Sequence, residues 1–203
     1  SGTAAFCAGA DILEFPQVYG DAKRTTDYNA LVREGQLELE QLSKPTIAMI
    51  RGGCVGGGCG IALSCDLRFV ADDARLGITP SRLGVAYSVP DTRRLAALVG
   101  PSRAKDMLFS GRLMDAAEAA SMGLVDRVVP GAALAETVSA YAQVLLNNAR
   151  GSIRTAKAMI NSISGVHPQP DGLLNDLFTQ SFSSDDFREG FNAFAQKRPP
   201  RFR

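Results

Sequence analysis

Residues 45–71, PTIAMIRGGCVGGGCGIALSCDLRFVA, decide how this chain folds. Residues 45–50 form a short apolar run that ends at glycines, which predicts a buried strand. Six glycines follow within the nine residues 52–60, and we expect them to form a loop. A helix over residues 60–65 and a strand over residues 66–71 complete the pattern. The order strand, glycine loop, helix, strand is typical of an α/β fold.

The flanking sequence is mainly helical. Apolar residues recur at helical spacing over residues 25–43, which predicts an amphipathic helix. From Pro90 onward, prolines at segment starts and glycines at segment ends delimit helices, with one strand expected over residues 124–129. The expected helices cover residues 90–100, 101–111, 115–123, 134–146, 152–163, 173–180 and 185–196. We therefore expect a core over residues 1–130 and a helical region over residues 131–203.

The composition excludes several classes of function. The 203 residues are 45% hydrophobic and 21% charged, with a net charge of +1, so nothing favours binding to nucleic acid. No apolar run is long enough to cross a membrane, and no signal peptide is visible, so we expect a cytoplasmic protein. Four cysteines accompany a single histidine. We expect reduced, mostly buried thiols and no metal site. The basic C-terminal residues are interpreted as a solvated tail.

The glycine run has a chemical interpretation as well as a structural one. A helix that begins at glycines has unpaired N–H groups and no Cβ atoms to keep a ligand away. Such a site suits a phosphate or a developing oxyanion. The sequence contains no G-x-x-x-x-G-K-[ST] pattern, and the run contains no G-x-G-x-x-G pattern, which disfavours nucleotides. The structural alternative is that the glycines only allow close packing of a helix and a strand.

Residues 1–11, SGTAAFCAGAD, are expected to be a loop that should follow a strand, and FCAGADI at residues 6–12 is a second small-residue loop. Together with residues 44–77, with GLVDRVV at residues 123–129 and with REGFNAFAQKRPPRF at residues 188–202, it resembles the crotonase superfamily, also called the enoyl-CoA hydratase/isomerase family. The resemblance implies an α/β fold with a crotonase (ClpP-like) ββα spiral core and a C-terminal helical region. Family members carry further strands ahead of the segment at residue 6, so we expect the N-terminal strands of the core to be missing.

The resemblance also implies a function and a set of site residues. Family members bind an acyl-CoA thioester and stabilise its enolate, some of them in fatty acid metabolism, and they form homotrimers or homohexamers. No separate cofactor is implied, because coenzyme A is part of the substrate. The backbone N–H groups of Ala10 and Gly57 correspond to the family's oxyanion hole. The residues that correspond to substrate-binding positions are Ala8, Gly9, Asp11, Ile12, Leu13, Gly56 and Lys197, the last for the phosphates of coenzyme A. Asp11 has an alternative role as a helix cap.

Two positions depart from the family pattern. Gly60 and Pro80 stand where hydratases of the family carry glutamates, so hydration by two glutamates is not expected. The segment TPSRLGVAY, residues 79–87, resembles the methylmalonyl-CoA decarboxylase branch and makes Thr79 and Tyr87 candidate catalytic residues. The match is partial, because that branch has a glutamate at position 60 and a histidine at position 10. The structural alternatives are a cap or turn hydroxyl for Thr79 and a half-buried aromatic for Tyr87.

The sequence therefore predicts an acyl-CoA enzyme of the enoyl-CoA hydratase/isomerase type. Its partner is an acyl-CoA thioester, with no nucleic acid and no membrane involved. The alternatives are an acyl-CoA decarboxylase and a non-catalytic acyl-CoA-binding subunit. Asp91 is either a carboxylate near the pocket or a residue of the first turn of a helix, where the helix dipole favours aspartate.

Overall fold

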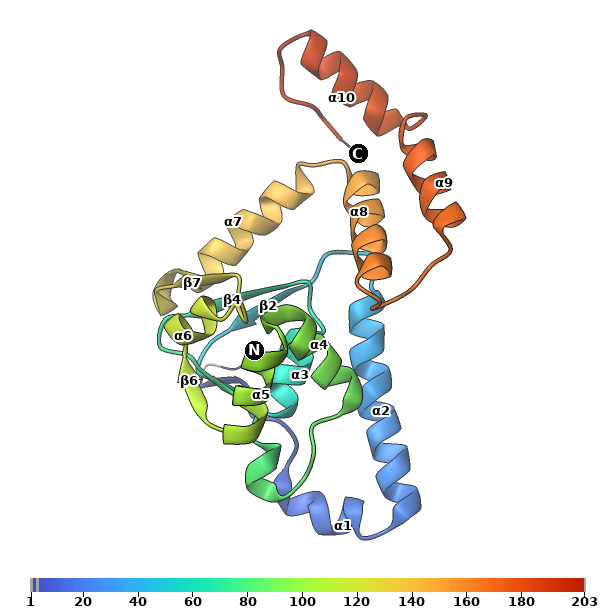
Figure 1. Ribbon diagram of the computed structural model, residues 1–203. Helices are drawn as coiled ribbons and strands as arrows, with labels where there is room; N and C mark the ends of the chain where they lie inside the picture. Colours follow the sequence, from blue (N-terminus) through green and yellow to red (C-terminus); the bar gives the residue numbers. More distant parts are fainter. Residues whose placement is uncertain (1, 3, 203) are drawn as a thin grey trace. The chain divides into compact units, whose positions relative to one another are not determined.

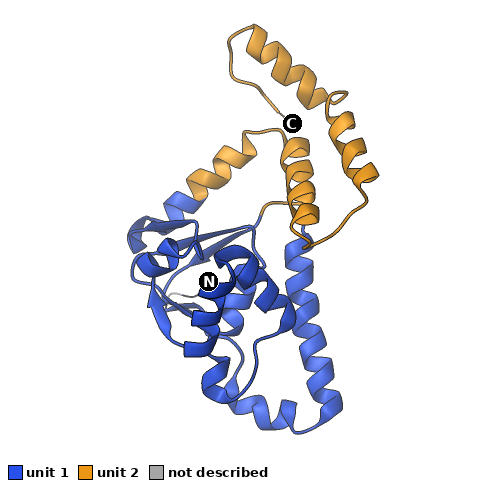
Figure 2. Ribbon diagram, in the orientation of Figure 1, with its two compact units in different colours: residues 1–42, 46–138 blue, residues 43–45, 139–203 orange. Residues whose placement is uncertain are grey.

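A computed structural model describes residue 2 and residues 4–202. The chain forms two compact units, which Figure 2 distinguishes by colour: unit 1 comprises residues 1–42 and 46–138, and unit 2 comprises residues 43–45 and 139–203. The sequence prediction placed the boundary at residue 130. Each unit is described by itself.

Unit 1 contains two small sheets (Figure 1). The first has the order β1-β3-β5-β6, with parallel pairs except for the antiparallel pair β5 and β6. The second has the order β2-β4-β7 and is parallel throughout. The strands are β1 (Ala5–Cys7), β2 (Ile47–Ile50), β3 (Gly53–Val55), β4 (Leu67–Ala71), β5 (Arg75–Gly77), β6 (Leu113–Asp115) and β7 (Arg127–Val129).

Strands β1 to β5 alternate between the two sheets, which gives the ββα repeat. β2 lies in the second sheet and β3 in the first; helix α3 follows, and the chain then returns to the second sheet as β4 and to the first as β5. The strands carry the core because parallel strands bury both faces. Their fully buried side chains include Ile50, Cys54, Phe69, Val70 and Leu76. This α/β architecture agrees with the predicted fold class.

Three helices of unit 1, α2, α4 and α6, begin at short polar caps. Asp21, Ser88 and Asp115 each accept a hydrogen bond from an N–H of the first helical turn. The elements are η1 (Ile12–Glu14), α1 (Phe15–Tyr19), α2 (Ala22–Gln41), α3 (Gly57–Leu63), η2 (Pro80–Leu83), α4 (Val89–Val99), α5 (Pro101–Ser110), α6 (Ala116–Ser121) and η3 (Gly131–Ala133). Helix α3 packs against β1, β3 and α4, so it is central to this unit.

Unit 2 is helical. Helix α7 (Leu134–Leu146) begins in unit 1 and continues into unit 2, and α8 (Arg150–Ile163), α9 (Asp171–Ser181) and α10 (Asp185–Ala195) follow. Glu189 of α10 accepts hydrogen bonds from the Arg198 guanidinium at 2.7 and 3.0 Å and from the Arg201 N–H at 2.7 Å. These bonds, with that of Arg198 the strongest, lower the pKa of Glu189 to about 2. None of the helices in the described part of the chain is both long and apolar enough to cross a membrane.

Most elements expected from sequence are present, and several details of the expectation were wrong. Helix α3 begins at Gly57 and not at Gly60, and strand β3 lies inside the glycine run that was expected to be a loop. Residues 1–11 were expected to be a loop but contain β1, and strands β5 and β6 were not predicted. Each of these strands has three residues, which is too short for an alternating pattern to be recognised.

The cysteines are free thiols, as expected. Cys54 and Cys59 are buried, whereas Cys7 and Cys65 are only partly so. The sulfur atoms of Cys54 and Cys59 lie 3.8 Å apart. The hydrogen bond between them and then burial raise the pKa of the Cys54 thiol far above its usual range, so this thiol stays neutral.

Candidate active site

The glycine run builds the site by letting helix α3 approach the end of strand β1. Gly56 precedes α3 with φ 56° and ψ −116°, a conformation that favours glycine. A Cβ atom on Gly58 would lie 2.1 Å from the carbonyl oxygen of Cys7, so only glycine permits this approach. The segment after β1 therefore lies against the first turn of α3.

Two backbone N–H groups lie close together at this contact. A Cβ atom on Gly57 would lie 3.9 Å from the nitrogen of Ala10, and one on Gly9 would lie 3.1 Å from the nitrogen of Gly57. Ala10 and Gly57 are both exposed. Among the described residues, no acceptor takes the N–H of Ala10, and none outside α3 takes that of Gly57. A first-turn N–H has no acceptor within its own helix. The structure thus brings together the two nominated donors and leaves both available to a ligand.

The residues that follow Ala10 form an exposed turn. The side chain of Asp11 accepts a hydrogen bond from the Leu13 N–H at 2.9 Å and caps η1. This is the capping role that the sequence offered as the alternative to substrate binding. The side chains of Ile12 and Leu13 are exposed, as is Ala8. Their assignment to substrate binding stays a prediction.

Thr79 and Tyr87 both approach Gly56. The Tyr87 hydroxyl donates a hydrogen bond to the Gly56 carbonyl at 3.3 Å, and Thr79 Oγ1 lies 4.0 Å from the Cβ position of Gly56. Thr79 precedes η2, but its side chain makes no capping hydrogen bond. Burial raises the pKa of Tyr87 well above its usual value, and the charge of Asp91 adds to this effect. The hydroxyl is therefore a hydrogen-bond donor and a weak proton donor.

A cavity of about 310 Å³ lies beside Tyr87. Its walls are mainly apolar and include Pro80, Val85, Leu108 and Phe109. Val85 and Phe109 are exposed, so this space is an open apolar groove and not an enclosed site. Pro80 supplies no acid or base to it.

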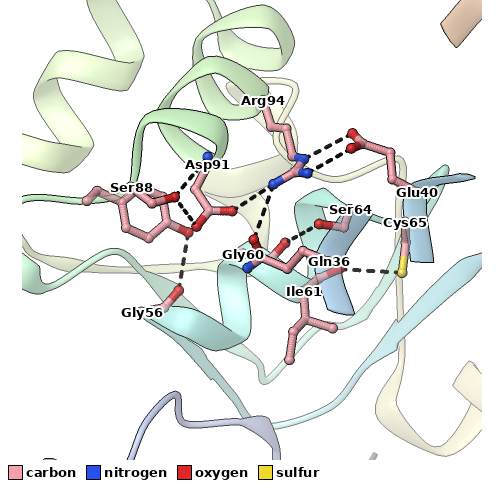
Figure 3. Close-up of polar contacts among 11 residues, drawn as sticks. Gln36, Glu40, Gly56, Gly60, Ile61, Ser64, Cys65, Ser88, Asp91 and Arg94 are labelled. Atoms are coloured by element: carbon pink, nitrogen blue, oxygen red, sulfur yellow. Dashed lines mark hydrogen bonds and ion pairs between the residues drawn. The ribbon is translucent and has the colours of Figure 1, made fainter. Parts of the chain in front are cut away.

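Gly60 is surrounded by polar side chains from other helices (Figure 3). A Cβ atom on Gly60 would lie 2.5 Å from Gln36 Nε2 and 3.1 Å from Asp91 Oδ1. Asp91 Oδ1 accepts a hydrogen bond from Arg94 at 3.1 Å, and Asp91 Oδ2 accepts one from the Ser88 hydroxyl at 2.6 Å. The guanidinium of Arg94 also pairs with Glu40 through two hydrogen bonds of 2.7 and 3.0 Å.

Sequence reasoning missed the contribution of helix α2 to this cluster. Gln36 is 5% exposed, whereas most of its neighbours on α2 face solvent. The surrounding sequence is polar, so no pattern marks this glutamine as buried. Lys197 belongs to unit 2, is exposed and has a φ of 53°. Its assignment to the phosphates of coenzyme A stays a prediction.

Comparison with known proteins identifies the family. The enoyl-CoA hydratase/isomerase family model matches residues 1–203. The "Probable enoyl-CoA hydratase echA8" of Mycobacterium tuberculosis is 36% identical over 200 residues, which are 98% of this chain and 76% of that protein. The crotonyl-CoA hydratase of Syntrophomonas wolfei is 34% identical over 205 residues, which are 100% of this chain and 77% of that protein.

Comparison with solved structures identifies the same family. The crystal structure of an enoyl-CoA hydratase from Bacillus anthracis matches with a TM-score of 0.87 and 33% identity, covering 100% of this chain and 78% of that one. This confirms the resemblance inferred from the glycine run and its flanking segments. The chain belongs to the enoyl-CoA hydratase/isomerase family and is an acyl-CoA enzyme with the crotonase fold.

Proposed function

We propose that this protein binds an acyl-CoA thioester and stabilises its enolate with the N–H groups of Ala10 and Gly57. The observation that supports this most directly is that the two donors lie side by side, exposed and without an acceptor among the described residues. Backbone donors held in the segment after β1 and in α3 need no reorganisation when negative charge develops on the thioester oxygen. One such donor typically contributes about 10²–10³ to the rate.

The acyl group would extend from the donors toward the apolar cavity beside Tyr87. Hydration by a pair of glutamates is not part of the proposal, because Gly60 and Pro80 carry no carboxylate. Decarboxylation is the second candidate, since loss of CO₂ generates the enolate without a base. The approach of Thr79 and Tyr87 to Gly56 favours it. The raised pKa of Tyr87 argues against that hydroxyl as the proton donor.

Mass spectrometry of thioesters tests the proposal. The protein is incubated with crotonyl-, 3-hydroxybutyryl-, 3-enoyl- and methylmalonyl-CoA, and the masses and retention times of the products are recorded. Conversion of any member of the panel supports enolate chemistry, and loss of CO₂ from methylmalonyl-CoA selects the decarboxylase. Binding of the thioesters without conversion would favour a non-catalytic acyl-CoA-binding subunit instead.

Tyr87→Phe tests whether the hydroxyl beside Gly56 matters. The substitution removes the 3.3 Å hydrogen bond to the Gly56 carbonyl and keeps the ring in the cavity wall. Because Gly56 sets the position of the Gly57 N–H, we expect turnover to fall about 10-fold, roughly the value of one neutral hydrogen bond. Binding of coenzyme A, measured by calorimetry, should not change. Wild-type turnover in this variant would make Tyr87 a structural residue.

We also propose the coenzyme A contact, the oligomeric state and the cellular location that the resemblance implies. Lys197 would contact the phosphates of coenzyme A. Homotrimers or homohexamers would form in the cytoplasm. Large exposed aromatic side chains of unit 2 support self-association: Phe178, Phe182, Phe191 and Phe194.

A further inference from the structure

The space beside Gly60 is occupied by two polar groups from distant parts of the chain. Gly60 is buried, and its missing side chain leaves room for Gln36 of α2 and Asp91 of α4, the groups nearest to its Cβ position. Figure 3 shows both side chains directed toward Gly60. A carboxylate therefore stands next to α3 although α3 itself contributes none.

The position of this carboxylate relative to the paired N–H groups follows from helix geometry. Gly60 lies three residues after Gly57, so the two share a face of α3 and are separated by about 4.5 Å along its axis. The Cα atom of a thioester lies about 2.4 Å from its carbonyl oxygen. With the oxygen at the Gly57 N–H, we place the Cα atom on the side of Gly60, where Asp91 is the nearest carboxylate.

Asp91 is held firmly and keeps the capacity to accept a proton. Its side chain is 7% exposed, and each carboxylate oxygen accepts one side-chain hydrogen bond, from Ser88 or from Arg94. A carboxylate oxygen accepts two, so each retains a lone pair. Arg94 donates two hydrogen bonds to the carboxylate of Glu40 and only one to that of Asp91. The charge on Asp91 is thus anchored without a bidentate partner.

Gln36 adds a second polar side chain beside Gly60. Its side-chain oxygen accepts a hydrogen bond from Arg94 at 3.3 Å. Among the described residues, no acceptor takes a hydrogen bond from its amide nitrogen, although the residue is only 5% exposed. No buried side-chain nitrogen or oxygen of the described residues lacks a partner, so this amide nitrogen retains access to solvent. The amide nitrogen is also the atom nearest to the Cβ position of Gly60.

We propose that Asp91 is the general base of this site, an inference that rests on the proposed function. Asp91 Oδ1 takes a proton from the Cα atom of the bound thioester. The electron pair of the broken C–H bond forms the Cα–C double bond, and the carbonyl pair moves onto the oxygen held by Ala10 and Gly57. Return of the proton restores the thioester, so no other reactant is needed. Arg94 is a positioning residue that fixes the carboxylate.

Exchange of the α-protons of butyryl-CoA in D₂O tests this step. Wild-type protein should incorporate up to two deuterons, detected by mass spectrometry. Asp91→Asn should slow exchange at least 100-fold, the usual minimum contribution of a positioned base. Binding of butyryl-CoA should stay within about threefold, because the substitution preserves shape.

Two further variants separate catalysis from folding. Asp126→Asn removes the carboxylate partner of another buried arginine of unit 1, Arg68. This variant should exchange the α-protons of butyryl-CoA at the wild-type rate. Asp91→Glu keeps the charge beside Arg94 but moves the carboxylate by about 1.5 Å, so exchange should fall about 10-fold even if Asp91→Asn does not fold. Wild-type exchange in both Asp91 variants would overturn the proposal. If the wild-type protein exchanged no protons and converted no thioester, the proposed function itself would fail.

Discussion

Gly57→Pro should lower thioester turnover by about 10²–10³-fold while the protein stays folded. Proline has no N–H, so the substitution removes one of the two donors that we assign to the thioester oxygen. Gly57 is the first residue of α3, and the first helical position is where proline is best tolerated. Steady-state kinetics on the thioester that the wild-type protein converts, together with circular dichroism, measures both effects.

Gly57→Ala is the matched control. It keeps the N–H, and its Cβ atom would lie 3.5 Å from the Cα atom of Gly9, an ordinary contact distance. We expect this variant to retain turnover within about 10-fold, because the donor remains and only its neighbours adjust. Equal turnover by the proline and alanine variants would show that the Gly57 N–H does not take part.

Gly58→Ala should be the most destabilising alanine substitution among the three glycines of α3. A Cβ atom there would lie 2.1 Å from the carbonyl oxygen of Cys7 and 2.8 Å from its carbonyl carbon. These are backbone atoms of β1, so no side-chain rotation relieves the clash, and β1 must move away from α3. Overpacking of this kind costs about 3 kcal/mol of unfolding free energy. Urea denaturation followed by circular dichroism measures the loss.

Gly35→Ala is the control for the general effect of replacing glycine. Gly35 lies within α2, and a Cβ atom on it would meet no other atom within 4 Å. The substitution should stabilise the protein by about 0.5–1 kcal/mol, since alanine favours the helix. If Gly58→Ala behaved like Gly35→Ala, the close packing of α3 on β1 would be refuted.

The parts of the fold that sequence predicted are those with a strong local signal. Strand β2 is an apolar run that ends at glycines, and helices α4 and α5 have proline near the start and glycine after the end. Strand β5 has no such signal. It forms because residues 75–77 pair with β3 on one side and with β6 on the other, and both partners are distant in sequence.

The beginning of α3 shows why the glycine run misled the prediction. Glycine disfavours helices, so a helix start at Gly60 was the natural expectation from sequence. In the structure the helix already begins at Gly57, because Gly58 and Gly60 allow Cys7, Gln36 and Asp91 to approach it. Packing with distant segments outweighs the local preference.

Some residues of the candidate site could be predicted from sequence, and others could not. Ala10 and Gly57 were found because the segments around them resemble a known family, and the structure shows their N–H groups close together. The polar cluster around Gly60 was not found. Gln36 and Glu40 lie on a polar helix, and only the fold reveals that Arg94 reaches them.

The central claim is that two backbone N–H groups polarise the thioester carbonyl. Its most direct test is the infrared difference spectrum of bound butyryl-CoA with and without ¹³C at the thioester carbonyl. We predict that the carbonyl stretch shifts to lower frequency on binding and that the shift is largely lost in Gly57→Pro but kept in Gly57→Ala. A bound carbonyl that absorbs at its solution frequency in the wild-type protein would contradict the account.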